Sequence, residues 1–354
     1  MKILHVITSL RTGGAEKLMV DLLPRLRDLG NDVELILFDG TRTPFYVELE
    51  NTGIKIHTLS LGVNVYNPLN IFRLRKYLKK YDIVHTHNTA CQYFVPLAKI
   101  ITRSKCKLIT TEHNTTNRRR SIIGFKLIDK FIYRRYNHII SISQKATENL
   151  MNYIGQNFSI TTIVNGVDIS IYNNLPKPNI SYKHEIIISM IAGFRKQKDQ
   201  DTLIKAISLL PDNYNLWLIG DGERREILEN LVNTLGLTNR VKFWGIRSDI
   251  PKLLAKSHIV VLSSHWEGLS LSSIEGMASG RPFIASDVDG LREIVNENGI
   301  LFPHRDEKTL AHEIKSLCEN TERYKQITIA CQAKAKQYDI NIMAKKYNNI
   351  YHDK

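Results

Sequence analysis

Two glutamates in the second half of the chain form the clearest pattern that could do chemistry. Glu267 and Glu275 are separated by seven residues in the segment EGLSLSSIE, which follows an apolar run at 259–262. We expect Glu267 in a turn and Glu275 one or two turns into a helix. Carboxylates placed there can serve a ligand, or they can simply complement the positive end of the helix dipole. The residues that flank the pair favour a ligand.

A short cationic loop is the second candidate. Arg195, Lys196 and Lys198 lie within residues 193–199, between an expected strand and an expected helix. Cations at the carboxyl end of a parallel sheet can clamp a phosphate group if they point at it. The alternative is a solvated run of charge, and we favour the clamp.

A glycine pair, Gly13 and Gly14, follows the first expected strand and opens the first expected helix. Glycines let a backbone approach a ligand closely, and the first N–H groups of a helix attract anions. The loop does not have the G-x-G-x-x-G spacing, so a tight turn without a ligand is an equally good interpretation.

Two further patterns resemble metal sites. Asp287 and Asp289 spell D-x-D, and His85 and His87 stand two residues apart at the end of a strand. The cationic loop already supplies positive charge for phosphates, and the histidines have no third ligand at a recognisable spacing. We therefore expect no metal, and for the histidines a structural or acceptor-side role.

The elements that would position these residues alternate between short β-branched runs and helical stretches, as in parallel sheets with crossover helices. The series runs once through residues 1–170 and again through 171–334, which predicts an α/β protein of two Rossmann-like, doubly wound domains facing across a cleft. Residues 173–185 lack apolar periodicity and are the expected linker. A single basic helix is predicted at 333–351, and the stretch from about 335 to 354 is expected to pack back on the first domain. The expected strands are 2–8, 32–38, 55–59, 83–86, 107–111, 138–141, 186–192, 216–219, 241–243 and 259–262, and the other expected helices are 15–29, 202–210, 224–235 and 248–256.

Composition indicates a folded protein, because 43% of residues are apolar and 24% are charged. No window reaches the about 18 apolar residues of a membrane span, and the first apolar run is too short for a signal peptide. The four cysteines lack metal-site spacing, so we expect reduced thiols and a cytoplasmic protein. The net charge of +14 lies mostly in residues 1–170, which carry 24 basic and 13 acidic side chains. Such a surface can meet nucleic acid, an anionic membrane or a phosphorylated substrate.

Ordered motifs along nearly the whole chain resemble the family 4 retaining glycosyltransferases of the GT-B fold, also described as glycosyltransferase group 1. They are TSLRTGGAE, DIVHTHN, TTEHN and SISQ in the first half, and VNGVD, GDGE, FWG, EGLSLSSIEGMASGRP and DVDGLREIV after it. This resemblance implies that the first domain takes the acceptor and that the second binds a nucleotide-sugar donor.

The resemblance also implies a role for each matched residue. Glu275 accepts hydrogen bonds from the donor ribose, Glu267 and the backbone after it hold the transferred sugar and diphosphate, and Lys198 neutralises the leaving diphosphate. The implied catalytic residues are Lys198, Arg195, Glu267 and His113, the last near the sugar, and the implied donor-binding residues are Gly13, Gly14, Trp244, Gly245, Arg247, Gly268, Leu269, Ser270, Leu271 and Glu275.

One position departs from the family pattern. The family has an arginine five residues before this lysine, where this chain has Gly193. Arg195 lies two positions later, and we assign it the role of the missing cation.

The activity implied is transfer of a hexose-type sugar, with retention, from a nucleotide-sugar to a saccharide or lipid-linked acceptor in cell-surface polysaccharide synthesis. We expect the donor to be a UDP-sugar. The sequence offers no evident nucleophile, which favours front-side attack assisted by the leaving phosphate. No cofactor and no metal are expected. A nucleotide-sugar epimerase on the same fold and a basic nucleic-acid-binding protein are the alternatives, but aromatic residues are only 8% and no nucleic-acid recognition motif is present.

Residues 118–135 interleave cations with apolar side chains and predict an interfacial helix. The alternative is an ordinary crossover helix. Because the first half carries most of the positive charge, we expect peripheral binding to an anionic membrane at its inner face.

Overall fold

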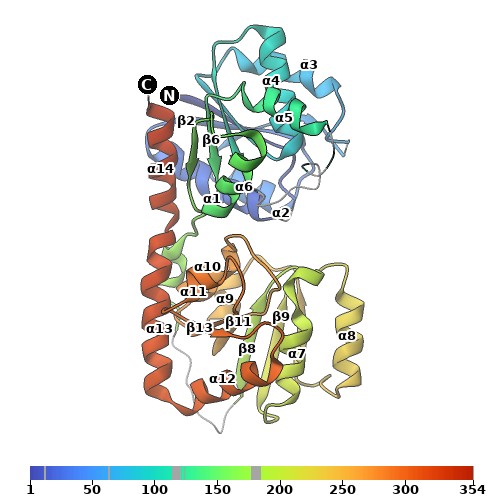
Figure 1. Cartoon of the computed structure of the whole chain (residues 1–354), viewed down its shortest axis with the longest axis vertical. Coiled ribbons are helices and arrows are strands. Elements are labelled where there is room, and N and C mark those ends of the chain that lie inside the picture. Colours follow the sequence, from blue (N-terminus) through green and yellow to red (C-terminus); the bar gives the residue numbers. More distant parts are fainter. Residues whose placement is uncertain are drawn as a thin grey trace. The chain divides into compact units, whose positions relative to one another are not determined.

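The computed structural model describes residues 1–11, 13–62, 64–113, 120, 122, 124–176 and 185–353. It divides into two compact units (Figure 1), one formed by Met1–Gly166 with Ile340–Lys354 and the other by Val167–Asp339. Each unit has its own parallel sheet and its own core.

The first unit contains a seven-stranded parallel sheet in the order β3-β2-β1-β4-β5-β6-β7. Its strands alternate with helices along the chain, so each connection crosses over a face of the sheet. The strands are β1 (Lys2–Ile7), β2 (Asp32–Asp39), β3 (Lys55–Ser60), β4 (Ile83–His87), β5 (Lys107–Glu112), β6 (His138–Ser141) and β7 (Ile160–Thr162), and the helices are α1 (Gly14–Asp28), α2 (Pro44–Asn51), α3 (Leu69–Leu78), α4 (Thr89–Thr102), α5 (Phe125–Tyr133), α6 (Gln144–Ile154) and α14 (Ile340–His352).

Alternation along the strands divides this sheet into two buried faces. Ile3 and Ile7 of β1 join the core that contains α1 and α14, whereas Leu4 and Val6 join the core formed with α3, α4, α5 and α6. Both faces are covered, which is why the strands read as continuous apolar runs in the sequence. Helix α14 packs beside α1, as Figure 1 shows.

The second unit has a six-stranded parallel sheet in the order β10-β9-β8-β11-β12-β13, and one apolar core surrounds it. The strands are β8 (Ile186–Ile191), β9 (Tyr214–Ile219), β10 (Val241–Gly245), β11 (Ile259–Leu262), β12 (Phe283–Ser286) and β13 (Ile300–Phe302), and the helical segments are η2 (Ile169–Tyr172), η3 (Lys196–Lys198), α7 (Gln200–Ser208), α8 (Arg225–Thr234), α9 (Ile250–Leu254), α10 (Leu271–Ala278), α11 (Arg292–Val295), α12 (Glu307–Glu319), α13 (Thr321–Ala335) and η4 (Lys336–Tyr338).

Each sheet reverses its strand order at one place, between β1 and β4 in the first unit and between β8 and β11 in the second. In doubly wound sheets the crossover connections leave such a place in opposite directions, which opens a crevice beyond the carboxyl ends of the strands. Ligands of doubly wound sheets bind in that crevice. Every predicted strand is present, and the chain is α/β as expected.

The single helix predicted at 333–351 is wrong. Helix α13 ends at Ala335, η4 follows, and Asp339 has an extended backbone with φ −63° and ψ 133° before α14 begins at Ile340. The break is held by a hydrogen bond from the Val167 N–H to the Tyr338 carbonyl (2.9 Å). The predicted linker at 173–185 lies largely outside the described residues, since 177–184 are not among them.

Candidate active site

The two loops that follow β8 and β11 are joined by hydrogen bonds at the point where the second sheet reverses. The His265 N–H donates to the Gln197 carbonyl (2.7 Å), the Gln197 side chain donates to the Trp266 carbonyl (2.7 Å), and Ser263 Oγ donates to the Asp199 carbonyl (2.7 Å). The cationic loop and the first glutamate, 69 residues apart in sequence, are thereby placed together.

Lys198 and Glu267 form an ion pair between these loops. Lys198 Nζ lies 2.5 Å from Glu267 Oε1, and the two side chains are 17% and 5% exposed. Ser264 Oγ donates to the same carboxylate oxygen (2.6 Å). Because both side chains are largely buried, removing either partner would leave an unpaired charge at a high cost in free energy. The pair therefore holds its geometry.

A run of free backbone donors follows Glu267. Among the described residues, the N–H groups from Gly268 to Ser272 have no hydrogen-bond partner, and α10 begins at Leu271 with Ser270 as its N-cap residue, whose side chain makes no capping bond. The sheet-facing side of α10 is fixed by Gly276, where a Cβ would lie 2.7 Å from the Phe283 ring. Unpartnered donors at a helix N-terminus attract an anion.

Glu275 lies inside α10, partly exposed, and its side chain has other contacts in the protein. It stands about one turn after the start of α10 at Leu271, within the one or two turns predicted for it. Gly268, Leu269, Ser270 and Leu271 form the segment between the two glutamates.

Arg195 is exposed on the loop between β8 and η3. The neighbouring Gly193 does not require a glycine, because a Cβ there would lie 3.7 Å from the Asp221 carbonyl oxygen, an ordinary contact, and its φ is not in the left-handed region. The backbone therefore has room for the arginine that the resemblance expects at this position.

Trp244 and Gly245 end β10, and Arg247 follows them. Lys242 Nζ lies 4.0 Å from the centroid of the Trp244 ring, and the indole N–H is buried with no partner among the described residues. Arg247 is bound by Asp249 through two contacts of 2.8 Å. An orphaned indole donor beside cations is suited to a polar aromatic ligand.

In the first unit, Gly13 is the N-cap residue of α1, with an extended backbone, and Gly14 is the first helical residue. The carboxylate of Glu16 folds back so closely that a Cβ on Gly13 would lie 2.1 Å from Glu16 Oε2. Asn88 donates to the same carboxylate (3.2 Å), and burial raises the pKa of Glu16. The protein's own carboxylate thus occupies the end of the helix where an anion was expected.

His113 follows β5 and hydrogen-bonds through Nε2 to His87 Nδ1 (2.9 Å). Burial lowers the pKa of His113 to about 4, so the ring is neutral at pH 7. His87 in turn lies 3.0 Å from His5, whose pKa burial lowers to about 3. Sequence reasoning missed His5, since its proximity follows only from the pairing of β1 with β4, in which His5 stands opposite His85.

Two groups in the second unit bear on the metal expectation. Asp287 is partly exposed and Asp289 is exposed, and Arg292 lies 2.5 Å from Asp287 and 4.0 Å from Asp289. A second cluster, Asp199, His265 and His304, was not anticipated, and its nitrogen and oxygen atoms lie within 4.8 Å of one another. It joins residues from three loops, so no local spacing reveals it.

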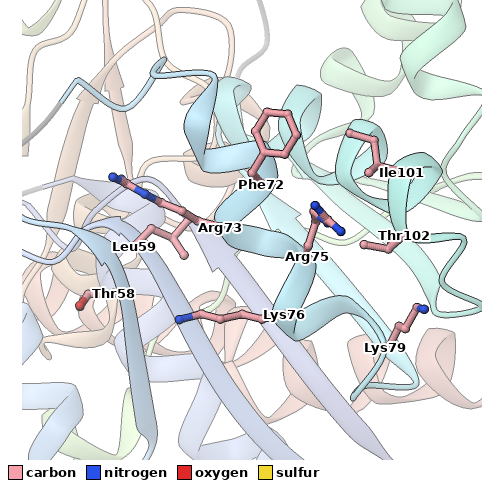
Figure 2. A pocket seen from close by; sticks show the side chains of 9 residues that line it. All are labelled: Thr58, Leu59, Phe72, Arg73, Arg75, Lys76, Lys79, Ile101 and Thr102. Atoms are coloured by element: carbon pink, nitrogen blue, oxygen red, sulfur yellow. The ribbon is translucent and has the colours of Figure 1, made fainter.

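A cationic pocket of about 720 Å³ lies on α3 of the first unit, with contributions from β3 and α4. Figure 2 shows Lys76 extending toward Thr58, and Arg75 and Lys79 on the side of Thr102. No acidic residue lines it, and Arg75, Lys76 and Lys79 form no ion pair with any described residue. Its apolar lining includes Phe72, which is 56% exposed.

A helix is present within residues 118–135 as α5, shorter than expected. Leu127, Ile128 and Phe131 are 76%, 50% and 45% exposed. Arg118 and Arg119 lie outside the described residues. Arg120 is turned inward, with its Nη2 3.4 Å from Glu112 and its guanidinium over the Tyr153 ring, so a surface role for this residue is wrong.

Within the described part of the chain, no helix combines the length and the apolar character needed to cross a bilayer.

Two family models match adjacent parts of the chain. Glycosyltransferase Family 4 matches residues 12–171 and Glycosyl transferases group 1 matches residues 172–333. Similar proteins include an N-acetyl-alpha-D-glucosaminyl L-malate synthase of Bacillus anthracis, 24% identical over 96% of this chain and 94% of the relative. Another is a UDP-Gal:alpha-D-GlcNAc-diphosphoundecaprenol alpha-1,3-galactosyltransferase of Escherichia coli, 25% identical over 82% of this chain and 80% of the relative.

Solved structures agree on the fold. HepE of Anabaena in complex with UDP-glucose has a TM-score of 0.84 at 24% identity, and sucrose-phosphate synthase of Thermosynechococcus elongatus has 0.78 at 18%, each covering 99% of this chain and 98% or more of the other. These likenesses show the two-unit GT-B fold, and the matches give no support to an epimerase or a nucleic-acid-binding protein. Together the two models account for residues 12–333, so the chain is a glycosyltransferase whose first half belongs to Glycosyltransferase Family 4 and whose second half belongs to Glycosyl transferases group 1.

Proposed function

We propose that the chain transfers a hexose-type sugar, with retention and without a metal or cofactor, from a UDP-sugar to a saccharide or lipid-linked acceptor in polysaccharide synthesis. The observation that carries this proposal is the Lys198–Glu267 ion pair beside the unpartnered N–H groups of residues 268–272. A fixed cation and a row of amide dipoles together suit a diphosphate on which negative charge develops.

In the proposed reaction, the bond between the anomeric carbon and the diphosphate oxygen breaks as the acceptor oxygen bonds to the same carbon. The acceptor proton passes to the leaving phosphate, so no enzyme nucleophile is needed. Lys198 and the exposed Arg195 stabilise the leaving charge, Glu267 orients Lys198 and the sugar, and His113 contacts the sugar.

The nucleotide would lie along the rest of the predicted set. Glu275 would hold the ribose hydroxyls, and Trp244, Gly245 and Arg247 the base, where the orphaned indole N–H offers a donor. We also assign Gly13 and Gly14 a contact with the donor, with the Glu16 carboxylate displaced when an anion binds.

The substrates are supported by relatives. The E. coli relative is named for a UDP-galactose donor and a diphosphoundecaprenol acceptor, and a structural neighbour was solved with UDP-glucose. We propose a lipid-linked acceptor here too, and a cytoplasmic enzyme held peripherally at an anionic membrane. The cationic pocket on α3 and the exposed apolar side of α5 support that location.

The test is a donor screen scored by nucleoside diphosphate release, with and without lipid-linked acceptors. Lys198→Ala should lower turnover with the best donor by at least about 10- to 150-fold, the value of a charge-assisted contact. Lys196→Ala, which removes an exposed cation of the same loop, is the matched control and should stay within about twofold of the parent. Near-normal turnover of Lys198→Ala would remove this loop from the reaction.

Metal independence is tested separately. Activity should survive EDTA, because Lys198 and the free amides already provide positive potential. Asp287→Asn combined with Asp289→Asn should keep residual activity, since Arg292 already binds Asp287. Complete loss on chelation, restored by magnesium or manganese, would overturn the metal-free mechanism.

A further inference from the structure

A continuous chain of hydrogen-bonding side chains runs beneath α14 from His113 into the core of the first unit. His113 Nε2 meets His87 Nδ1 (2.9 Å), and His87 Nε2 meets His5 Nδ1 (3.0 Å). His5 Nε2 then meets the Tyr351 hydroxyl (3.3 Å), which also meets His85 Nδ1 (2.7 Å). We call this series the histidine chain; with the two residues at its inner end, it consists of His113, His87, His5, Tyr351, His85, Thr111 and Tyr347.

The inner end of the histidine chain is closed by two hydroxyls. His85 Nε2 lies 2.8 Å from Thr111 Oγ1, which lies 3.2 Å from the Tyr347 hydroxyl. His5, His85, His87 and Thr111 are all fully buried, as are Tyr347 and Tyr351 of α14. At the outer end, Nδ1 of His113 has no partner among the described residues.

His5, His85 and His87 have nitrogens within 4.8 Å of one another, which raises the question of a metal. Their ring planes argue against one. The His85 ring stacks on His87 at 4.4 Å with 20° between planes, and on His5 at 5.0 Å with 28°. Lone pairs lie in the ring plane, so stacked rings direct them side by side instead of at one centre, and every nitrogen of the three already has a hydrogen-bond partner.

Because a neutral imidazole carries one N–H and one lone pair, only two senses of the histidine chain place one hydrogen in every contact. In one sense, hydrogen bonds are donated inward from His113, and the last hydrogen, on Tyr347, has no acceptor among the described residues. In the other, Tyr347 donates to Thr111, Thr111 to His85 Nε2, and each following group to the next one outward. The second sense leaves no buried hydrogen unpaired, and leaving one unpaired is costly.

We propose that the histidine chain holds His113 as the tautomer that carries its proton on Nδ1, so that His113 donates a hydrogen bond to a substrate oxygen and does not act as a base. His5, His87 and Tyr351 are then positioning residues for His113. The Nδ1–H of His113 suits a ligand oxygen that accepts a hydrogen bond, such as a sugar hydroxyl or a phosphate oxygen. The use of that donor rests on the proposed function, whereas the tautomer itself does not.

The tautomer is measured in the ligand-free full-length enzyme, labelled with ¹⁵N in histidine, from the two-bond couplings of ring nitrogens to ring protons at pH 7.5. His113, assigned by comparison with His113→Gln, should show a protonated Nδ1 and an unprotonated Nε2. Tyr351→Phe removes the hydroxyl that links His5 to His85 and so separates His113 from the inner end. The spectrum of this variant should show a mixture of tautomers, and kcat/KM should fall by about 3- to 10-fold, the range for a misdirected hydrogen bond.

Tyr136→Phe is the matched control, because the Tyr136 hydroxyl is equally buried but bonds Thr86 and the Gln92 carbonyl on the other face of the sheet. It should leave the His113 tautomer unchanged. A protonated Nε2 on His113 in the parent enzyme, a Tyr351→Phe spectrum identical to the parent, or a stoichiometric metal bound to the three buried histidines would each overturn the inference. Unchanged sugar transfer by His113→Ala would instead overturn the proposed role of His113 in the reaction and leave the tautomer standing.

Discussion

At the residue level, the pairing of Lys198 with Glu267 separates the roles of the two glutamates. Glu267→Ala should lower kcat by at least tenfold and also weaken donor binding, because it releases Lys198 from its ion pair and removes the proposed sugar contact. Glu275→Ala should weaken nucleotide binding, since buried ribose hydroxyls lose a charged acceptor, worth about 1.5 to 3 kcal/mol. Calorimetry measures the affinity of each variant for UDP alone and so distinguishes the two roles. Weaker UDP binding in Glu267→Ala with normal binding in Glu275→Ala would reverse the two assignments.

The departure at Gly193 can be tested by restoring the family residue. A side chain fits at this position, so Gly193→Arg should fold normally. If Arg195 serves as the shifted cation, Arg195→Ala should lower kcat/KM less than Lys198→Ala does, and adding Gly193→Arg should recover most of the loss. Steady-state kinetics of the two single variants and the double variant give the answer. No recovery would mean that a cation at 193 does not reach the phosphates.

Buried neutral histidines should make the first unit sensitive to acid. Burial lowers the pKa of His113 to about 4 and of His5 to about 3, while an exposed histidine titrates near 6.5. The unfolded chain therefore binds protons that the folded chain does not, and stability is full above about pH 6.5 and falls as the pH drops toward 4. Each such histidine should contribute up to about 1.4 kcal/mol of lost unfolding free energy per pH unit.

Urea unfolding at a series of pH values measures this slope. His113→Gln should reduce it, whereas His312→Asn, at an exposed position of α12, should leave it unchanged. A slope that is the same in all three proteins would show that His113 takes up its proton without unfolding.

Much of the candidate site could be predicted from residue types in sequence, since Lys198, Glu267 and Glu275 each lie within or beside an element with a clear local pattern. The contact between Lys198 and Glu267 could not, because it depends on β8 and β11 being neighbours although β9 and β10 intervene in sequence. His5 was missed for the same reason: the third member of the cluster comes from another strand, and the spacing of His85 and His87 carries no information about it.

At the level of elements, the loop before α11 is held against the site by one glycine. Gly290 has φ +84°, and a Cβ there would lie 2.2 Å from the Glu267 carbonyl oxygen and 2.6 Å from that of Gly268. Gly290→Ala should displace the backbone beside Glu267 and lower kcat/KM by at least tenfold, with a loss of stability of about 1 to 3 kcal/mol.

Gly236→Ala is the matched control for that change. Gly236 also has a left-handed backbone, with φ +68°, but a Cβ there would meet nothing within 4 Å. It should cost stability without affecting donor binding, as thermal unfolding and UDP titration would show. Equal activities in the two variants would mean that the Gly290 contact does not position Glu267.

The strands that sequence analysis did not anticipate are β7, β12 and β13, which have three, four and three residues. Segments this short give almost no periodicity, and their pairing partners decide whether they form strands. The prediction of one helix at 333–351 failed differently. It rested on the apolar periodicity, which does not show the interruption at Asp339, where the Val167 N–H donates to the Tyr338 carbonyl.

At the scale of the whole molecule, the uneven charge predicts reversible binding to anionic vesicles. The cations Arg73, Arg75, Lys76 and Lys79 line one pocket of the first unit, and each basic residue near an anionic leaflet contributes about 1 kcal/mol. Sedimentation with vesicles containing phosphatidylglycerol should carry the protein down, neutral vesicles should not, and salt should reverse the binding.

Replacing Arg75, Lys76 and Lys79 by serine should weaken that binding by at least tenfold. A triple change of Lys308, Lys315 and Lys325 in the second unit, which removes the same charge elsewhere, is the control and should have a much smaller effect. Equal binding of the protein to anionic and neutral vesicles would exclude the anionic membrane as the ligand of this pocket. Arg120→Ser should destabilise the fold instead, because its partner Glu112 is buried.

The division of the chain has a consequence for biosynthesis. The first unit needs α14, whose Tyr347 and Tyr351 bury the histidine chain, yet these residues follow the whole of the second unit in sequence. On the ribosome, residues 1–166 therefore emerge long before the part of their sheet under α14 can be covered, while the second unit, contiguous from Val167 to Asp339, can fold as soon as it has been translated. The half of the enzyme that is made first is the half that finishes folding last, and a transcript cut before Ile340 would yield a nascent product with polar histidines exposed on an uncapped sheet.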